Sequence, residues 1–174
     1  MLRKSLLWVG LSILILVGCS NEQVTDGKVE PDPDAEAYIA EIEDDRALVE
    51  TCYYTIEDDT ELVKQGGSEI SSADLQVGMK VQVWSNGVAA ESYPCQTKAV
   101  KLIVLTNDDS KKEQEAVRAI MELASSQYEK PIILLESLVT EDKNGFEATL
   151  QVLHETDEEV KVYYDFKTKQ ATIR

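Results

Sequence analysis

Apolar and polar residues alternate along three segments of the chain, residues 79–83, 146–152 and 160–166. A period of two is typical of a β-strand that buries one face and exposes the other. Two Asn-Gly pairs, Asn86-Gly87 and Asn144-Gly145, have the composition of type I′ hairpin turns. These features predict an antiparallel fold that is mainly β, with strands joined by tight turns.

The first predicted domain, residues 37–106, is expected to be all β. Residues 38–42 and 47–49 flank the turn-like Glu43-Asp44-Asp45, and Leu102 to Leu105 forms a more buried closing strand. A loop that contains Gly66, Gly67 and Ser68 separates the early strands from the strand at 79–83. About five short strands at this spacing favour a small, OB-like β-barrel.

The second predicted domain, residues 107–174, adds a helix, so the overall class is mainly β or α+β. Ser110-x-x-Glu113 fits a capping box, and Pro131 is expected to end the helix. Its predicted apolar face consists of Val117, Ile120, Met121, Ala124 and Tyr128. Strands expected at 132–140, 146–152, 160–166 and 171–173 would form a three- or four-stranded antiparallel meander under this helix.

Residues 1–18 have the organisation of a secretory signal peptide. Arg3 and Lys4 precede about twelve residues that are almost all apolar, from Leu6 to Val17. A spanning helix needs about twenty apolar residues, so a permanent transmembrane segment is the weaker interpretation.

The segment Leu16-Val17-Gly18-Cys19 resembles the lipobox of bacterial lipoproteins. That resemblance implies a diacylglyceryl group on Cys19 and cleavage just before it. The alternative is an ordinary cleaved signal with an unrelated cysteine. Residues 19–36 are then a lipidated cysteine followed by a polar tether that contains Pro31 and Pro33, and the protein is expected at the outer face of the cytoplasmic membrane.

The charge of the chain argues against nucleic acid as a partner. Asp and Glu number 33 against 17 Lys and Arg, which gives a formal charge of -16. Affinity for nucleic acid depends mainly on Lys and Arg that neutralise phosphates. We also expect no cofactor and no metal site, and a monomer whose partners are the membrane and an envelope protein.

Part of the first domain resembles a family of short lipoproteins of Gram-positive bacteria, the domain of unknown function 3221 family. The residues that carry the resemblance are Leu75 to Trp84, then Asn86-Gly87, then Glu91 to Gln96. They correspond to the family's "vGxkVxVw" strand and "eSYPaq" segment, and the resemblance covers about residues 37–106. It implies a fold and a location but no reaction, and Cys95 stands where the family often has a small residue.

Two further cysteines, Cys52 and Cys95, remain once Cys19 is lipidated. Outside the cytoplasm, two such cysteines in one small domain are natural disulfide partners. Two buried free thiols or a reactive Cys95 are the alternatives that the sequence leaves open.

Four aromatic residues, Tyr53, Tyr54, Trp84 and Tyr93, form a candidate binding surface on the barrel. The alternative, which is the interpretation we favour, is that these rings pack in the core or at its rim. The Tyr93-Pro94 bond is a candidate for a cis peptide in a tight turn.

Catalytic or metal-binding residues are harder to assign. His154 is either a general base or metal ligand, or a solvated histidine among acidic neighbours, which is the interpretation we favour. The acidic clusters lack EF-hand spacing, so a solvated acidic surface is favoured over a calcium site. These clusters are Glu41, Glu43, Asp44 and Asp45; Glu57, Asp58, Asp59 and Glu61; and Asp108-Asp109.

The sequence therefore predicts a membrane-anchored, non-enzymatic binding or accessory module of the cell envelope. Binding of a small solute or a cation is the first alternative. An enzyme that acts on envelope material through paired carboxylates is the second, although no motif places two carboxylates across a cleft.

The lipobox interpretation predicts the behaviour of Cys19→Ser. Without its thiol the chain accepts no lipid, so the variant should appear in the medium or accumulate as uncleaved precursor. Membrane fractionation followed by intact-mass analysis measures this directly. A variant that fractionates with membranes and also has the mass of a cleaved, lipidated chain would contradict the lipobox interpretation.

Overall fold

The structure is a computed structural model that describes residues 31–129, 131–153 and 159–174. The predicted signal peptide, Cys19, most of the tether and His154 lie outside the described residues. Residues 32–174 form one compact unit. Within the described ranges, no helix is long and apolar enough to cross a membrane.

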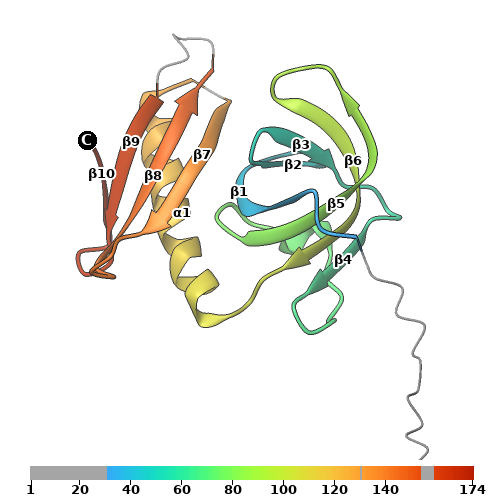
Figure 1. Ribbon diagram of the computed structural model, residues 1–174, viewed down its shortest axis with the longest axis horizontal. Coiled ribbons are helices and arrows are strands. Elements are labelled where there is room, and N and C mark those ends of the chain that lie inside the picture. The colour runs from blue at the N-terminus through green and yellow to red at the C-terminus, as the bar shows by residue number, and fades with distance from the viewer. Residues whose placement is uncertain (1–30, 130, 154–158) are drawn as a thin grey trace, which may run out of the picture. The chain divides into compact units, whose positions relative to one another are not determined.

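Five strands close into a barrel in the order β3-β2-β1-β5-β6, and β6 returns to pair with β3 (Figure 1). The closing pair β3–β6 is parallel, while the other barrel pairs are antiparallel. This arrangement confirms the predicted OB-like barrel. The strands are β1 (Ala35–Glu43), β2 (Arg46–Val49), β3 (Cys52–Thr55), β5 (Lys80–Ala90) and β6 (Cys95–Val104), and β4 (Glu61–Lys64) extends the sheet beyond β6.

The barrel closes at a disulfide. Cys52 and Cys95 face each other in the first register position of the β3–β6 pair, with their Cα atoms 4.4 Å apart, and their sulfur atoms are bonded. The bond confirms the predicted pairing and leaves neither cysteine as a free thiol. Because it closes a loop over a sequence separation of 43 residues, it stabilises the fold by about 4 kcal/mol in the chain-entropy treatment.

The remaining chain forms a helix on a four-stranded antiparallel sheet, as the sequence predicts. Helix α1 (Asp108–Gln127) runs across one face of the sheet, whose strand order is β10-β9-β8-β7 (Figure 1). The alternating residues Phe146, Ala148, Leu150 and Val152 are all buried on this face. The strands are β7 (Ile132–Val139), β8 (Gly145–Val152), β9 (Glu159–Asp165) and β10 (Gln170–Ile173).

One hydrophobic core joins the barrel to this α+β layer. Tyr38, Ala40, Leu48 and Tyr53, on β1, β2 and β3, are buried in the same cluster as the apolar face of α1 and the inner face of its sheet. Their sequence neighbours, such as Ile39 and Tyr54, point instead into the barrel. The separate domains 37–106 and 107–174 stay a prediction, while residues on both sides of that boundary share this core.

The Asn86-Gly87 turn was predicted wrongly. Strand β5 continues through this pair to Ala90, and the reversal of the chain lies between Ala90 and Cys95. The pairing with β6 shifts between Ser85 and Ala89, and Gly87 has φ of +76° inside that irregularity. The pair therefore marks a bulge in a long strand, because a glycine at positive φ serves a bulge as well as a turn. The Tyr93-Pro94 bond is cis, as expected.

Other element ends also differ from the sequence expectation. Asn107, not Ser110, caps α1, since the Asn107 side chain accepts a hydrogen bond from the Ser110 amide at 2.8 Å. The helix ends at Gln127, before Pro131. The second Asn-Gly pair does lie at a hairpin, at the end of the connection between β7 and β8. Gly145 is the first residue of β8, and the residue of the connection with a positive φ is Lys143.

Gly78 lies where the barrel touches α1. Its φ is +87°, and a Cβ atom there would be 2.5 Å from the carbonyl oxygen of Gln114 in the helix. The Gly78 amide donates to the carbonyl of Ile39 at 2.8 Å, which fixes its position. Any larger side chain must push barrel and helix apart.

We expect Gly78→Ala to destabilise the protein more than a matched control. Gly67 has φ of +89° but open space around its Cα atom, so Gly67→Ala should cost only the backbone strain, about 1–2 kcal/mol. Gly78→Ala should cost about 1–3 kcal/mol more because of the clash. Urea unfolding of both variants measures the difference. Equal losses would show that the contact with α1 is unimportant.

Candidate functional site

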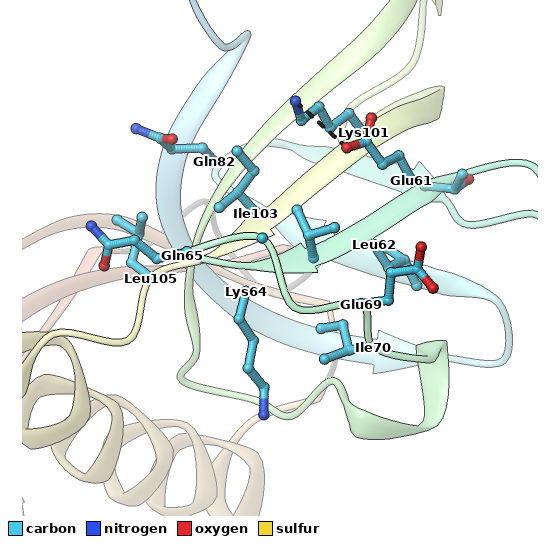
Figure 2. A pocket seen from close by; sticks show the side chains of 14 residues that line it. Glu61, Leu62, Lys64, Gln65, Glu69, Ile70, Gln82, Lys101, Ile103 and Leu105 are labelled. Carbon is cyan, nitrogen blue, oxygen red and sulfur yellow. Dashed lines mark ion pairs between the residues drawn. The ribbon is translucent and has the colours of Figure 1, made fainter.

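An open groove of about 710 Å³ lies on the barrel surface (Figure 2). We call it the β4–β6 groove, because residues of both of these paired strands line it. Its size lies in the range typical of ligand-binding clefts. The lining residues are Thr60 to Gly67, Glu69, Ile70, Gln82, Lys101, Ile103 and Leu105.

Strand register explains why several of these side chains meet. Ile103 of β6 pairs with Val63 of β4 on one side and with Gln82 of β5 on the other. Paired residues in neighbouring strands point to the same face, so these three side chains lie together outside the barrel. Figure 2 shows Ile103 near the centre of the groove. Half-buried aliphatic residues therefore form much of its floor.

Charged residues of both signs line the groove. It is lined by two lysines, Lys64 and Lys101, and two glutamates, Glu61 and Glu69. The Lys101 ammonium lies 3.7 Å from the Glu61 carboxylate and 5.5 Å from the centre of the Trp84 ring. Lys64 points away from this pair (Figure 2), so the neutral Glu61–Lys101 ion pair is the part of the groove that could meet a charged ligand, on a chain whose formal charge is -16.

A short hairpin covers the outer edge of β4. The Lys64 amide donates to the Ser68 carbonyl at 2.8 Å, and the Ile70 amide donates to the Leu62 carbonyl at 3.0 Å. Val63 and Glu69 form the bridge between them. Gly66 and Gly67, both at positive φ, allow the chain to reverse here. The backbone of this wall is therefore already hydrogen-bonded.

Comparison with known protein families bears on this part of the chain. Residues 36–106 match the model of a family described as "Protein of unknown function (DUF3221)". The barrel is similar to this family. The match confirms the resemblance found in the sequence and includes every residue that lines the β4–β6 groove. Neither the curated proteins nor the solved structures contain a significant match.

The structure does not bring the four predicted aromatic residues together on one surface. Tyr53 and Tyr54 are consecutive on β3, so Tyr53 packs in the core shared with α1 and Tyr54 points into the barrel. Trp84 is also buried, whereas Tyr93 is 56% exposed and donates a hydrogen bond from its hydroxyl to Gln151 at 2.5 Å.

Buried tyrosines of the barrel resist ionisation. Burial, and then the negative charges of Asp34 and Glu50, raise the pKa of Tyr54 to about 12. Burial and a hydrogen bond to Glu41 raise the pKa of Tyr53 still further. The carboxylate of Glu41, from the first acidic cluster, therefore has a structural partner.

Several other predicted acidic residues also form ion pairs. The Lys98 ammonium contacts Glu57 at 2.9 Å and Asp59 at 3.0 Å, and these hydrogen bonds raise the pKa of Lys98. Asp108 lies 3.9 Å from Lys111. Among the described residues, no three His, Cys, Asp or Glu side chains are grouped so that they could hold a metal ion.

Sequence reasoning missed the groove. Strand β4 is short and pairs in parallel with a strand about forty residues later, so local periodicity contains no sign of the surface that the two strands create. The one local signal was the Gly66-Gly67-Ser68 segment, which the sequence marks only as a loop.

The raised pKa of Tyr54 predicts a loss of stability in alkali. The unfolded chain releases this proton near pH 10, while the folded protein keeps it until about pH 12. The stabilisation is therefore complete below pH 10 and decreases as pH rises from 10 to 12, by up to about 2–3 kcal/mol for this residue.

Tyr54→Phe removes the ionisable hydroxyl and should reduce this decrease. Urea unfolding at a series of pH values between 8 and 12 measures the slope, with Tyr93→Phe as a control that removes an exposed hydroxyl. The same alkaline slope for Tyr54→Phe and the unchanged protein would contradict the assignment.

Proposed function

We propose that this protein is a lipid-anchored, non-enzymatic binding or accessory module of the Gram-positive cell envelope. The diacylglyceryl group on Cys19 would hold it at the outer face of the cytoplasmic membrane, and the β4–β6 groove would be its binding surface. The lipobox-like Leu16-Val17-Gly18-Cys19 supports the anchor.

The disulfide between Cys52 and Cys95 is the observation that carries the proposed location. Disulfides form and persist in oxidising compartments and are rare in the bacterial cytoplasm. In this chain the bond joins the two strands that close the barrel, so the fold is suited to assembly outside the cytoplasm. A thiol-reducing compartment would remove a substantial part of its stability.

The groove supports a binding role because it is formed by paired strands rather than by a loose loop. Its walls are fixed by the β4–β6 and β5–β6 pairings and by the hairpin that covers β4. A preformed surface loses little conformational entropy when a ligand binds. An envelope protein or a small solute would occupy it.

Small-solute or cation binding is the alternative, and the groove volume of 710 Å³ suits a small molecule. An enzyme with paired carboxylates receives less support. The carboxylates of Glu41, Glu57 and Asp59 accept hydrogen bonds from Tyr53 or Lys98, and these contacts stabilise the barrel.

Purification of the lipidated protein from its native membranes tests the proposal. After gentle solubilisation, co-purifying proteins are identified by mass spectrometry, with Cys19→Ser as the unanchored control. We expect one envelope protein to be enriched over that control. Enrichment of nothing would favour the small-solute alternative, and a soluble native protein would contradict the proposed location.

A further inference from the structure

The described chain enters the fold at the rim of the β4–β6 groove. The Gln82 side chain, which lines the groove, donates a hydrogen bond to Glu36 at 2.7 Å. The Asp34 amide donates to the Val83 carbonyl at 2.9 Å, and the Ser85 amide donates to the Asp34 carboxylate. The segment that precedes β1 is therefore fastened to β5 beside the groove.

This position limits the distance between the groove and the proposed anchor. Thirteen residue positions separate Cys19 from Asp32, and a chain of that length spans at most about 45 Å when fully extended. If Cys19 is anchored as proposed above, the groove is confined to a layer of about that depth next to the membrane surface.

The groove itself restricts the chemistry of what it binds. A peptide strand has no free edge to join at β4, because Lys64 and Ile70 already use that edge for the covering hairpin. None of the lining residues is aromatic and none is arginine, so stacking on a base or a sugar has no platform here. The lining instead combines aliphatic side chains with lysine ammonium groups and glutamate carboxylates.

We propose that the β4–β6 groove binds a zwitterionic phospholipid of the membrane surface. This inference rests on the proposed anchoring. The alkyl part would lie on Val63, Ile103 and Leu105, where it removes apolar surface from water. The phosphate would contact Lys101 and the ammonium group would contact Glu61, whose ion pair at 3.7 Å is exposed enough on the Glu61 side to exchange partners.

Charge favours a zwitterionic lipid over an anionic one. The body of the protein has a large negative charge, which repels an anionic headgroup as well as an anionic surface. The neutral Glu61–Lys101 pair offers each charge of a zwitterion a counter-charge without adding to that repulsion. Selectivity for the zwitterion is therefore part of the proposal.

The test uses the full mature chain with Cys19→Ser, so that no attached acyl chain competes for the groove. Three soluble probes are titrated by NMR below their critical micelle concentrations: dihexanoylphosphatidylethanolamine, dihexanoylphosphatidylglycerol and glycerophosphoethanolamine. We expect saturable shifts at residues 61–70, 82 and 101–105 with the first probe. The anionic lipid and the headgroup without acyl chains should each bind about tenfold more weakly.

Two groove variants have matched controls. Ile103→Thr keeps a β-branched residue but removes apolar surface, and should weaken binding about fivefold. Val100→Thr makes a comparable change at a residue of the same strand that is 42% exposed and outside the groove, and should leave binding unchanged. Lys101→Gln should weaken binding about tenfold, whereas Lys161→Gln, on the far sheet, should not.

Absence of saturable shifts at the groove would overturn the proposal, as would equal binding of the anionic lipid or of the free headgroup. If none of the three probes causes saturable shifts, but the groove is needed to retain a co-purifying envelope protein, the groove is a protein-docking surface. That result would overturn the lipid proposal and leave the proposed function standing. Loss of membrane fractionation in the native protein would instead contradict the proposed function itself.

Discussion

Strand β6 is the element on which the barrel depends, because it forms three different pairings along its ten residues. It is antiparallel to β5 throughout, parallel to β3 over residues 95–98, and parallel to β4 over residues 101–104. The first of the parallel pairings closes the barrel and is reinforced by the Cys52–Cys95 bond. The second creates the groove wall. The N-terminal half of β6 therefore closes the barrel, and its C-terminal half lines the groove.

The barrel also has no open face where OB-like barrels commonly bind ligands, the face around strands two and three. In this protein the outward residues Leu48 and Tyr53 of those strands are covered by the α+β layer. The Tyr38 ring meets Phe146 edge-on with ring centres 5.8 Å apart, and its hydroxyl donates to Glu113 at 2.7 Å. This contact is both apolar and hydrogen-bonded, so the α+β layer covers this face of the barrel, while the groove across β4, β5 and β6 stays open.

The sequence was most informative where a strand buries one face and exposes the other to solvent. Residues 146–152 alternate in burial as they alternate in polarity. Both the strand itself and the face that it buries were therefore predictable. Strand β3 was missed as an element because Tyr53 and Tyr54 are both buried, one on each side of the sheet, which hides the alternation. The local signal at Asn86-Gly87 was overridden by pairing with β6. The groove depends on a long-range parallel pairing, for which short-range patterns contain no information.

The barrel shares its outer core with residues that lie outside the family match. The family match ends at residue 106, yet Tyr38, Ala40, Leu48 and Tyr53 within it are buried in one cluster with residues beyond that point. A barrel cut off there would present a contiguous apolar patch to water, and such patches promote association. A protein that contains this barrel alone would therefore need polar side chains at these four positions, or would need to bury them against another chain.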